Sequence, residues 1–312
     1  MKIILALFAL LVSNLIQANP LNNIVMFGDS LSDNGNLYQL MKIPSSPPYY
    51  EGRFSNGPVW VEALAESYFH EKSKKHLQDY AFGGAAIPEE YNEDVMSLDR
   101  EIALYLAAHH EKASDKSLYI IWIGANNYLM TPKDVEGTVA IVNKGIKKGV
   151  KTLIKAGAKH IMLVNLPDLG LSPFPSLYYP EDEAPLVREI LSLYTKRHNE
   201  LLSETVNELK QSNPEVQWLY LNASSNFNKF LESPERYGIS NTKDACYSSD
   251  TDDQPVKNSM LHIASRVQER TAPGSCDDYL FFDAVHPTAK AHKIIAEHAR
   301  VYLETEGVDI VG

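Results

Sequence analysis

The chain has 312 residues, 44% of them hydrophobic and 22% charged, which is enough to bury a large core in one α/β domain or two small ones. Its formal net charge of −11 at pH 7 argues against nucleic acid as a partner and against electrostatic capture by anionic membranes. A lipid substrate stays compatible with this charge, because lipids are also bound through apolar contacts.

The N-terminus has the pattern of a secretory signal peptide. A lysine follows the first methionine, residues 3–16 form an apolar run, and Gln17-Ala18 offers a small residue for cleavage. We favour this reading over a membrane anchor, because the run is too short for a stable span. We therefore predict a signal peptide over residues 1–18 and a secreted protein. No linker rich in Pro, Gly or Ser divides residues 19–312, which predicts a single domain there.

The two cysteines agree with export. An even number in a secreted chain predicts a disulfide, here Cys246–Cys276, with two free thiols as the alternative. The loop between them holds a polar run at 248–259 and ends shortly before Asp283. We expect an activating protease to act in the 246–276 loop, with an inert surface loop as the alternative. No Cys/His group has metal-ligand spacing, and we expect no metal and no cofactor.

Short hydrophobic runs alternate with longer amphipathic stretches along the chain. We predict strands at 24–27, 118–123 and 161–165, and weaker strands around 79–81 and 216–221. Helical periodicity falls at 58–71, 93–112, 134–156, 183–211 and 287–305. Pro287 is expected at the first position of the last helix, where its missing N–H costs nothing. Alternation of strands and helices predicts a parallel sheet covered by helices on both faces.

Two irregular segments, at 43–54 and 172–180, combine prolines with aromatic residues. Because loops at a sheet's edge are normally polar, this composition indicates an apolar substrate site. Ordinary packing of Pro and Tyr against the core explains the composition equally well. The sequence leaves both readings open.

A serine follows the first predicted strand, in Gly28-Asp29-Ser30, at the strand end where open α/β sheets place their ligand chemistry. Much later, Asp283 and His286 stand three positions apart just before the last helix. Ser, His and Asp together make a nucleophilic acyl-transfer site, because the hydroxyl needs a base and the base needs an orienting carboxylate. This combination predicts ester hydrolysis or acyl transfer.

Acyl transfer also needs hydrogen-bond donors for the oxyanion. The glycine pair Gly83-Gly84 follows a short strand and exposes backbone N–H groups, and Asn126 follows the strongest strand. A backbone N–H and an asparagine amide are a suitable set of donors. No Gly-x-Ser-x-Gly occurs in the chain, which argues against the nucleophile elbow of the α/β-hydrolases.

With these four blocks in this order, the chain resembles the SGNH hydrolases, also called GDSL lipases and esterases, over nearly all of the predicted mature chain. The resemblance implies a three-layer α/β/α fold of the flavodoxin-like type, with a central, mostly parallel five-stranded sheet. It assigns the nucleophile to Ser30, the acid to Asp283 and the base to His286. It also gives the Ser30 N–H a place in the oxyanion hole.

The resemblance assigns the other two oxyanion donors to the Gly84 N–H and the Asn126 amide, with the adjacent Gly83 as the alternative glycine. Two residues depart from the family pattern. Asp79 stands where the second block often has Asn, which puts the local hydrogen bonding in doubt. Asn127 stands where the third block often has Asp, which puts only a supporting carboxylate in doubt.

The extended forms of the blocks look like the branch of secreted bacterial phospholipases and acyltransferases. This resemblance implies a lysophospholipase A or phospholipase A with an acyltransferase side activity. Its partner is then a lysophospholipid or another acyl-ester lipid, reached through transient contact with lipid surfaces. A secreted carbohydrate or aryl ester esterase is the runner-up, because the same fold hosts those activities. A binding protein with a vestigial site is a third reading.

Other polar residues have ordinary structural explanations. Four histidines are expected at surface or structural positions: His109, His110, His292 and His298. Asp29 and Asp33 look like an acid pair. We interpret them as capping and charging the turn after the first strand, because a helix N-terminus favours anions.

Overall fold

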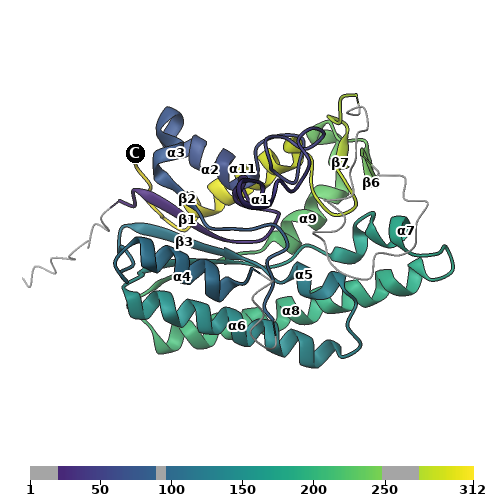
Figure 1. Ribbon diagram of the computed structural model, residues 1–312. Helices are drawn as coiled ribbons and strands as arrows, with labels where there is room; N and C mark the ends of the chain where they lie inside the picture. Colours follow the sequence, from purple (N-terminus) through teal and green to yellow (C-terminus); the bar gives the residue numbers. More distant parts are fainter. Residues whose placement is uncertain (1–19, 89–95, 248–273) are drawn as a thin grey trace, which may run out of the picture.

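The computed structural model describes residues 20–88, 96–247 and 274–312 (Figure 1). The predicted signal peptide at 1–18 and the polar run at 248–259 lie outside the described residues. The hydrophobic core extends from Leu21 to Ile310. These two ends of the described chain meet, since the Leu21 N–H donates to the Asp309 carbonyl at 2.7 Å.

The main sheet has five parallel strands in the order β2-β1-β3-β4-β5. The strands are β1 (Asn23–Gly28), β2 (Leu77–Asp79), β3 (Ser117–Trp122), β4 (His160–Val164) and β5 (Gln217–Leu221). β1 and β3 lie at the centre and are almost fully buried, which explains why they are continuous apolar runs in the sequence. The predicted parallel five-stranded sheet is confirmed.

Helices cover both faces of this sheet (Figure 1). α2 (Trp60–Phe69) and α11 (Ala289–Thr305) pack together on one face. The other face is covered by α4 (Leu98–Ala108), α6 (Val135–Ala156) and α8 (Ala184–Ser212). This arrangement confirms the three-layer α/β/α fold, with element ends shifted by a few residues from the predicted ranges.

The ends of two helices show how local residues set the boundaries. α6 begins after Asp134, whose carboxylate accepts from the Gly137 N–H, and ends at Gly157, where φ is 120°; both features are standard signals for a helix start and end. α11 begins later than predicted, at Ala289, because the Thr288 hydroxyl caps it. Pro287 precedes this cap, so the prediction that it occupies the first helical position is wrong.

Several short elements were not predicted. Besides α1 (Asn36–Met41), which is the helix expected after the turn of Asp29 and Asp33, they are the helices α3 (Ser73–His76), α5 (Ala125–Leu129), α7 (Phe174–Tyr178) and α9 (Ala223–Glu232), and a parallel two-stranded sheet of β6 (Asn241–Ala245) and β7 (Tyr279–Phe281). Most are too short to show a hydrophobic period in the sequence. The predicted disulfide joins Cys246, after β6, to Cys276, before β7.

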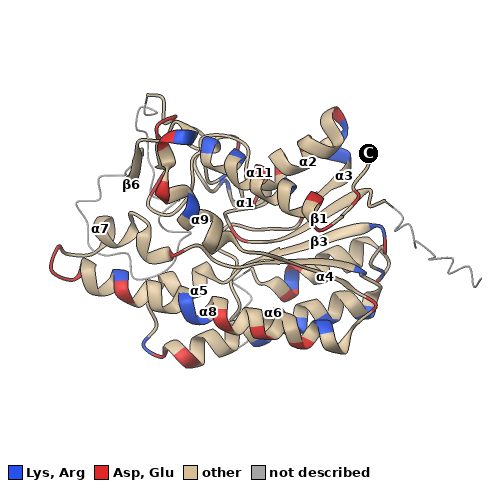
Figure 2. Cartoon of the chain, turned by 180° about the vertical axis from the view of Figure 1, so that it is seen from behind, with Lys and Arg blue, Asp and Glu red and all other residues tan. Residues whose placement is uncertain are grey.

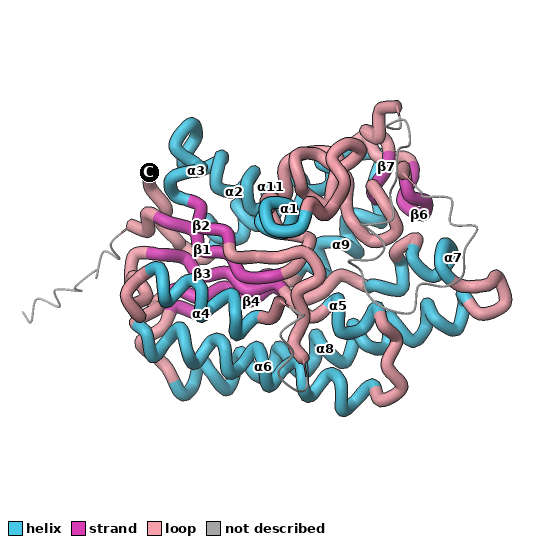
Figure 3. The backbone as a smooth tube through the Cα atoms, in the orientation of Figure 1, coloured by secondary structure: helices cyan, strands magenta, loops and turns pink. Residues whose placement is uncertain are grey.

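Long loops gather at the carboxyl ends of the main strands, where the small sheet also lies (Figure 3). This end of the sheet is the region that holds ligand chemistry in open α/β folds. Charges of both signs are interspersed along the outer faces of α6 and α8 (Figure 2). One exposed pair joins these helices, with Arg197 Nε 2.7 Å from Glu136 Oε1. Across the described ranges, no helix combines the length and apolar character needed to cross a membrane.

Candidate active site

Ser30 lies just beyond the carboxyl end of β1. The strand ends at Gly28, where a Cβ would lie 2.4 Å from the Trp122 carbonyl oxygen, so only glycine allows this close approach to β3. The chain then turns at Asp29, whose carbonyl accepts from the Asp33 N–H at 3.0 Å. This turn places Ser30 at the edge of the sheet, where the residue is 5% exposed.

Ser30, His286 and Asp283 form one hydrogen-bonded chain. His286 Nε2 lies 2.7 Å from Ser30 Oγ, and His286 Nδ1 lies 2.7 Å from Asp283 Oδ2. The segment between β7 and α11 is folded by Asp283 itself, because its Oδ1 accepts from the backbone N–H groups of Val285 (3.0 Å) and His286 (2.8 Å). The short segment that holds Asp283 and His286 therefore lies next to Ser30, which is 256 positions before His286 in the chain.

The environment of Asp283 favours its ionised form. Burial acts to raise the pKa of Asp283, but the charge of His286 and hydrogen bonds from His286, Tyr49 and Val285 outweigh burial and lower the pKa below its usual value. An ionised Asp283 holds a proton on His286 Nδ1. The Nε2 atom of His286 then faces Ser30 as a hydrogen-bond acceptor, which is the arrangement that a general base requires.

The two glycines after β2 have different surroundings. The Gly83 N–H donates to Asp33 Oδ2 at 2.7 Å, and a Cβ on Gly83 would lie 2.3 Å from Phe54 Cε2. Gly84 is partly exposed and has a φ of 77°, in the left-handed region that favours glycine. Because the Gly83 N–H is already engaged, Gly84 is the better candidate for an oxyanion donor.

Asn126 and Asn127 begin α5 and fix the loop that follows β2. Asn126 Nδ2 donates to the Ala85 carbonyl at 2.8 Å, one position after Gly84. The amide of Asn127 both donates to the Ile87 carbonyl (2.7 Å) and accepts from the Ile87 N–H (3.0 Å). An ionised carboxylate only accepts, so this double contact requires an amide. This double contact explains why the chain has Asn127 where the family pattern often has Asp.

Asp33 ties the turn after β1 to the glycine loop. Its carboxylate accepts from three N–H groups at the start of α1, those of Gly35, Asn36 and Leu37, in addition to that of Gly83. This agrees with its interpretation as a capping residue. Burial raises the pKa of Asp33 to about 6 despite these hydrogen bonds. The sequence did not reveal the link to Gly83, because the two residues are 50 positions apart.

Asp29 and Asp79 are acidic groups with buried carboxylate oxygens. Asp29 Oδ1 accepts from the Leu31 N–H at 3.1 Å, and burial raises the pKa of Asp29 to about 6. Asp79 is the residue that stands where the family pattern often has Asn. Its Oδ1 accepts from the Ala81 N–H at 2.9 Å, and burial raises its pKa well above the usual value. Both side chains hold local backbone turns.

The other histidines have the structural environments that were expected, with one exception. His109 stacks on Tyr105 with ring centroids 4.3 Å apart, and His292 is buried with Nδ1 accepting from the Trp60 N–H at 3.1 Å. His298 lines a cavity, which the sequence did not reveal. Among the described residues, no three His, Cys, Asp or Glu side chains are grouped to hold a metal ion.

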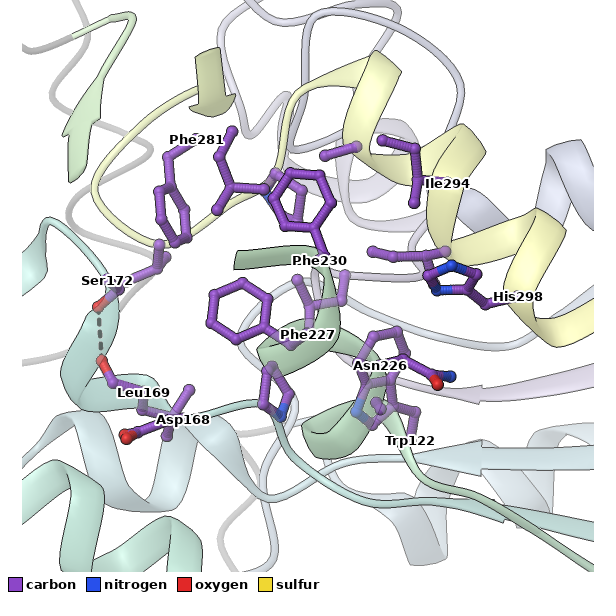
Figure 4. Close-up of a pocket in the computed structure, with 18 of the residues that line it drawn as sticks. Trp122, Asp168, Leu169, Ser172, Asn226, Phe227, Phe230, Phe281, Ile294 and His298 are labelled. Atoms are coloured by element: carbon purple, nitrogen blue, oxygen red, sulfur yellow. Dashed lines mark hydrogen bonds between the residues drawn. The ribbon is translucent and has the colours of Figure 1, made fainter. Parts of the chain in front are cut away.

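An apolar cavity of about 100 Å³ lies over the carboxyl ends of β3, β4 and β5 (Figure 4). Phe227 and Phe230 of α9 lie at its centre, between Asp168 and Ser172 at one end and Asn226 and His298 at the other. The cavity wall also includes the chain neighbours of the hydrogen-bonded triad, namely Leu31, Val285 and Pro287. Ser30, Asp283 and His286 are not themselves part of this wall.

The two segments rich in proline and aromatic residues have different roles. In 43–54, Tyr49 and Phe54 are each 2% exposed, so the packing interpretation holds for these aromatic rings. In 172–180, Ser172 lines the cavity while Phe174 is buried beside it in the chain. Sequence reasoning missed that Tyr49 contacts Asp283. The only feature of the sequence that pointed to Tyr49 was its position as an aromatic residue in a proline-rich loop.

The chain matches the model of the GDSL-like Lipase/Acylhydrolase family over residues 24–299. It belongs to this family. A phosphatidylcholine-sterol acyltransferase from Aeromonas hydrophila is 32% identical over 335 aligned positions, which cover 97% of this chain and 96% of the relative. The secreted effector protein SseJ from Salmonella typhimurium is 27% identical, with 90% of this chain and 63% of the relative covered.

A solved structure of a putative GDSL-like lipase from Parabacteroides merdae is similar over 93% of this chain and 99% of its own. The TM-score is 0.45 and the sequence identity is 14%. The family and the relatives identify the protein as a carboxylic ester hydrolase or acyltransferase of the GDSL class.

Proposed function

We propose that the protein is a secreted serine esterase that hydrolyses acyl esters of lipids, most specifically a lysophospholipase A or phospholipase A. The observation that carries this proposal is the apolar cavity whose wall includes Leu31, Val285 and Pro287, the chain neighbours of Ser30 and His286, because an acyl chain needs such a surface and an acetylated sugar does not. The acyltransferase relative from Aeromonas hydrophila supports transfer to an acceptor alcohol as a side activity. A carbohydrate or aryl ester esterase is the competing function.

The mechanism follows from the hydrogen-bonded chain. Ser30 Oγ attacks the ester carbonyl carbon while its proton moves to His286 Nε2, and Asp283 stabilises the imidazolium that forms. The Ser30 and Gly84 N–H groups and the Asn126 amide donate to the oxyanion. His286 then gives the proton to the leaving alcohol. Water, or an acceptor alcohol, attacks the acyl-enzyme while His286 takes its proton, and His286 returns this proton to Ser30 Oγ as the bond to the acyl group breaks and the acid or new ester leaves.

Contact with lipid surfaces is part of the proposal. Leu171 and Leu177 are 38% and 43% exposed, and Leu171 directly precedes Ser172 of the cavity wall. These side chains offer an apolar surface to a membrane or micelle. Export by the predicted signal peptide and activation by a protease in the 246–276 loop also remain proposals. Export is tested by the N-terminal sequence of the protein in the culture medium, and activation by activity before and after cleavage mapped within 248–259.

The test of the mechanism is the loss of turnover in triad variants. Ser30→Ala, His286→Ala and Asp283→Ala should each remove nearly all activity, with effects that do not add because the three groups act as a unit. Asp283→Asn should also fail, because the amide favours the wrong imidazole tautomer. The readout is kcat on a chromogenic short-chain ester, with circular dichroism as the folding control. Near-normal activity in folded Ser30→Ala would refute the mechanism.

The substrate class is tested by comparing two products. We expect the purified protein to release fatty acid from lysophosphatidylcholine much faster than acetate from acetylated sugars. The reverse order would favour the carbohydrate esterase. A glycerol or sterol acceptor added to the lipid assay, with mass spectrometry of the products, measures transfer against hydrolysis.

Phe227 provides a second test of the lipid assignment. Phe227→Trp fills part of the cavity, so kcat/KM for a long-chain ester should fall by about tenfold or more, since losing contact with two methylenes costs about that factor. The acetate ester should be hardly affected. Asn228→Ala, at the adjacent exposed position of α9, is the control. An equal loss for both esters would place the acyl chain elsewhere.

A further inference from the structure

Tyr49 contacts the acid of the proposed triad from a distant segment of the chain. Its hydroxyl oxygen lies 2.6 Å from Asp283 Oδ2, and the two residues are 234 positions apart. Both residues are buried, so water does not compete for this contact. Because an ionised carboxylate only accepts, the tyrosine hydroxyl donates, and a hydrogen bond to a charged group of this length is a strong one.

The remaining contacts of Asp283 show what Tyr49 adds. Oδ1 accepts from the N–H groups of Val285 and His286. His286 Nδ1 lies 2.7 Å from Oδ2 and 2.9 Å from Oδ1. Tyr49 and the imidazole therefore share the negative charge of Oδ2. The strength of the tyrosine hydrogen bond affects how much of this charge the imidazole experiences.

The tyrosine ring is fixed by aromatic neighbours. It packs edge-on against Phe282, with ring centroids 5.2 Å apart, and against Tyr247, next to the disulfide, at 6.4 Å. Phe54, from the same segment as Tyr49, lies 5.1 Å from the His286 ring. One proline-rich segment thus supports both the acid and the base.

Tyr49 is a hydrogen-bond donor at neutral pH. Burial and the adjacent Asp283 raise the pKa of Tyr49 well above its usual value, so its proton is retained. The other titratable groups that act on this cluster are Asp29 after β1, His292 on α11, Tyr178 on α7 and Tyr247 after β6.

We propose that Tyr49 is a positioning residue of the triad. Its hydroxyl orients the Asp283 carboxylate and withdraws part of the negative charge that would otherwise stabilise the His286 imidazolium. His286 then stays unprotonated, and able to accept the Ser30 proton, to lower pH than it would without the tyrosine hydroxyl. The inference rests on the proposed triad and deepens it.

The first test is the pH dependence of kcat/KM for a soluble chromogenic ester in Tyr49→Phe, because this profile reports the protonation of the free enzyme's base. Without the hydroxyl, more negative charge faces the imidazolium, so deprotonation of the base requires higher pH. We expect the acidic limb to move up by about half a pH unit or more. A lower plateau with an unchanged KM is the expected effect of a less well oriented carboxylate.

A second variant covers the case in which Tyr49→Phe folds poorly. Replacing Tyr49 with 3-fluorotyrosine keeps the ring and the hydroxyl but makes the hydroxyl a stronger donor. The acidic limb should then move down, opposite to the shift in Tyr49→Phe. A purely structural role for Tyr49 would lower thermal stability without moving the limb in either variant.

Tyr119→Phe is the matched control. Tyr119 is also fully buried, and its hydroxyl bonds to that of Tyr105 at 2.8 Å in a different part of the core. This variant should leave the pH profile unchanged. If the acidic limb of the kcat/KM profile does not shift in folded Tyr49→Phe or in the fluorotyrosine variant, the inference is overturned. That result is distinct from failure of the triad itself, which would appear as activity in Ser30→Ala.

Discussion

Asn126 and Asn127 are neighbours in the chain, but their amide groups make different hydrogen bonds. Both ends of the Asn127 amide are bonded to the backbone of Ile87, so this residue holds the loop. Among the described residues, Asn126 Nδ2 has one hydrogen-bond partner, the Ala85 carbonyl, and an amide nitrogen carries two hydrogens. At the scale of single residues, Asn126 therefore has a donor left for an oxyanion beside Gly84.

Asn126→Ala should lower kcat by roughly 100-fold or more and leave KM for a soluble ester little changed. The reason is that the donor acts on charge that develops only in the transition state. Steady-state kinetics of the folded variant measure both constants. A raised KM with normal kcat would instead show that Asn126 only holds the substrate.

Among the elements, α4 supports β1, the strand that precedes the proposed nucleophile Ser30. Glu101 of this helix is fully buried, and its Oε2 accepts from the Gly28 N–H at the end of β1, at 2.9 Å. Burial raises the pKa of Glu101 well above the model-compound value of 4.5. The folded protein therefore binds a proton that the unfolded chain loses above about pH 4.5, and this linkage reduces stability as the pH rises.

Glu101→Gln should remove this pH dependence. A glutamine keeps the acceptor for the Gly28 N–H and has no proton to lose. Relative to the variant, the wild type should lose unfolding free energy as the pH rises from 5 to 7. Urea unfolding at both pH values measures the difference, and Glu66→Gln on the exposed side of α2 is the control. If the free energy of unfolding changes with pH equally in the wild type and in Glu101→Gln, Glu101 is not the source of the pH dependence.

At the scale of the whole molecule, the disulfide connects the small sheet to the segment of Asp283. Cys246 and Cys276 are 30 positions apart, and the Cys246 and Tyr247 N–H groups donate to Phe281 and Phe282. Phe282 directly precedes Asp283. The cross-link therefore holds the two strands of the small sheet together next to the segment that carries Asp283.

Removing the disulfide should lower the free energy of unfolding by about 3–4 kcal/mol, the value that loop-closure entropy gives for a loop of this length. The chain has two cysteines, so the Cys246→Ser/Cys276→Ser double variant and the reduced wild type should agree. Denaturant unfolding with and without reductant measures both. Unchanged stability in both samples would show that the loop is not constrained in the unfolded chain.

The fold class and the residues of the proposed triad were predicted from the amino-acid sequence alone. The central strands are buried on both faces, which makes them continuous apolar runs, and the covering helices carry their own periodicity. Ser30, Asp283 and His286 were predicted because together they supply a nucleophile, a base and an orienting carboxylate, and because they belong to ordered blocks that resemble those of the family. These signals are local, so they are visible before the chain folds.

Three features became visible only in the folded protein: which glycine N–H is already engaged, what the proline-rich segments contact, and which residues line the apolar cavity. Each of these depends on contacts between distant parts of the chain. Gly83 is engaged because Asp33 reaches it from another loop, and Tyr49 meets Asp283 across 234 positions. The cavity is assembled from three strand ends, α9 and α11. Neither periodicity nor spacing records such contacts, because they arise only when the strands and helices pack.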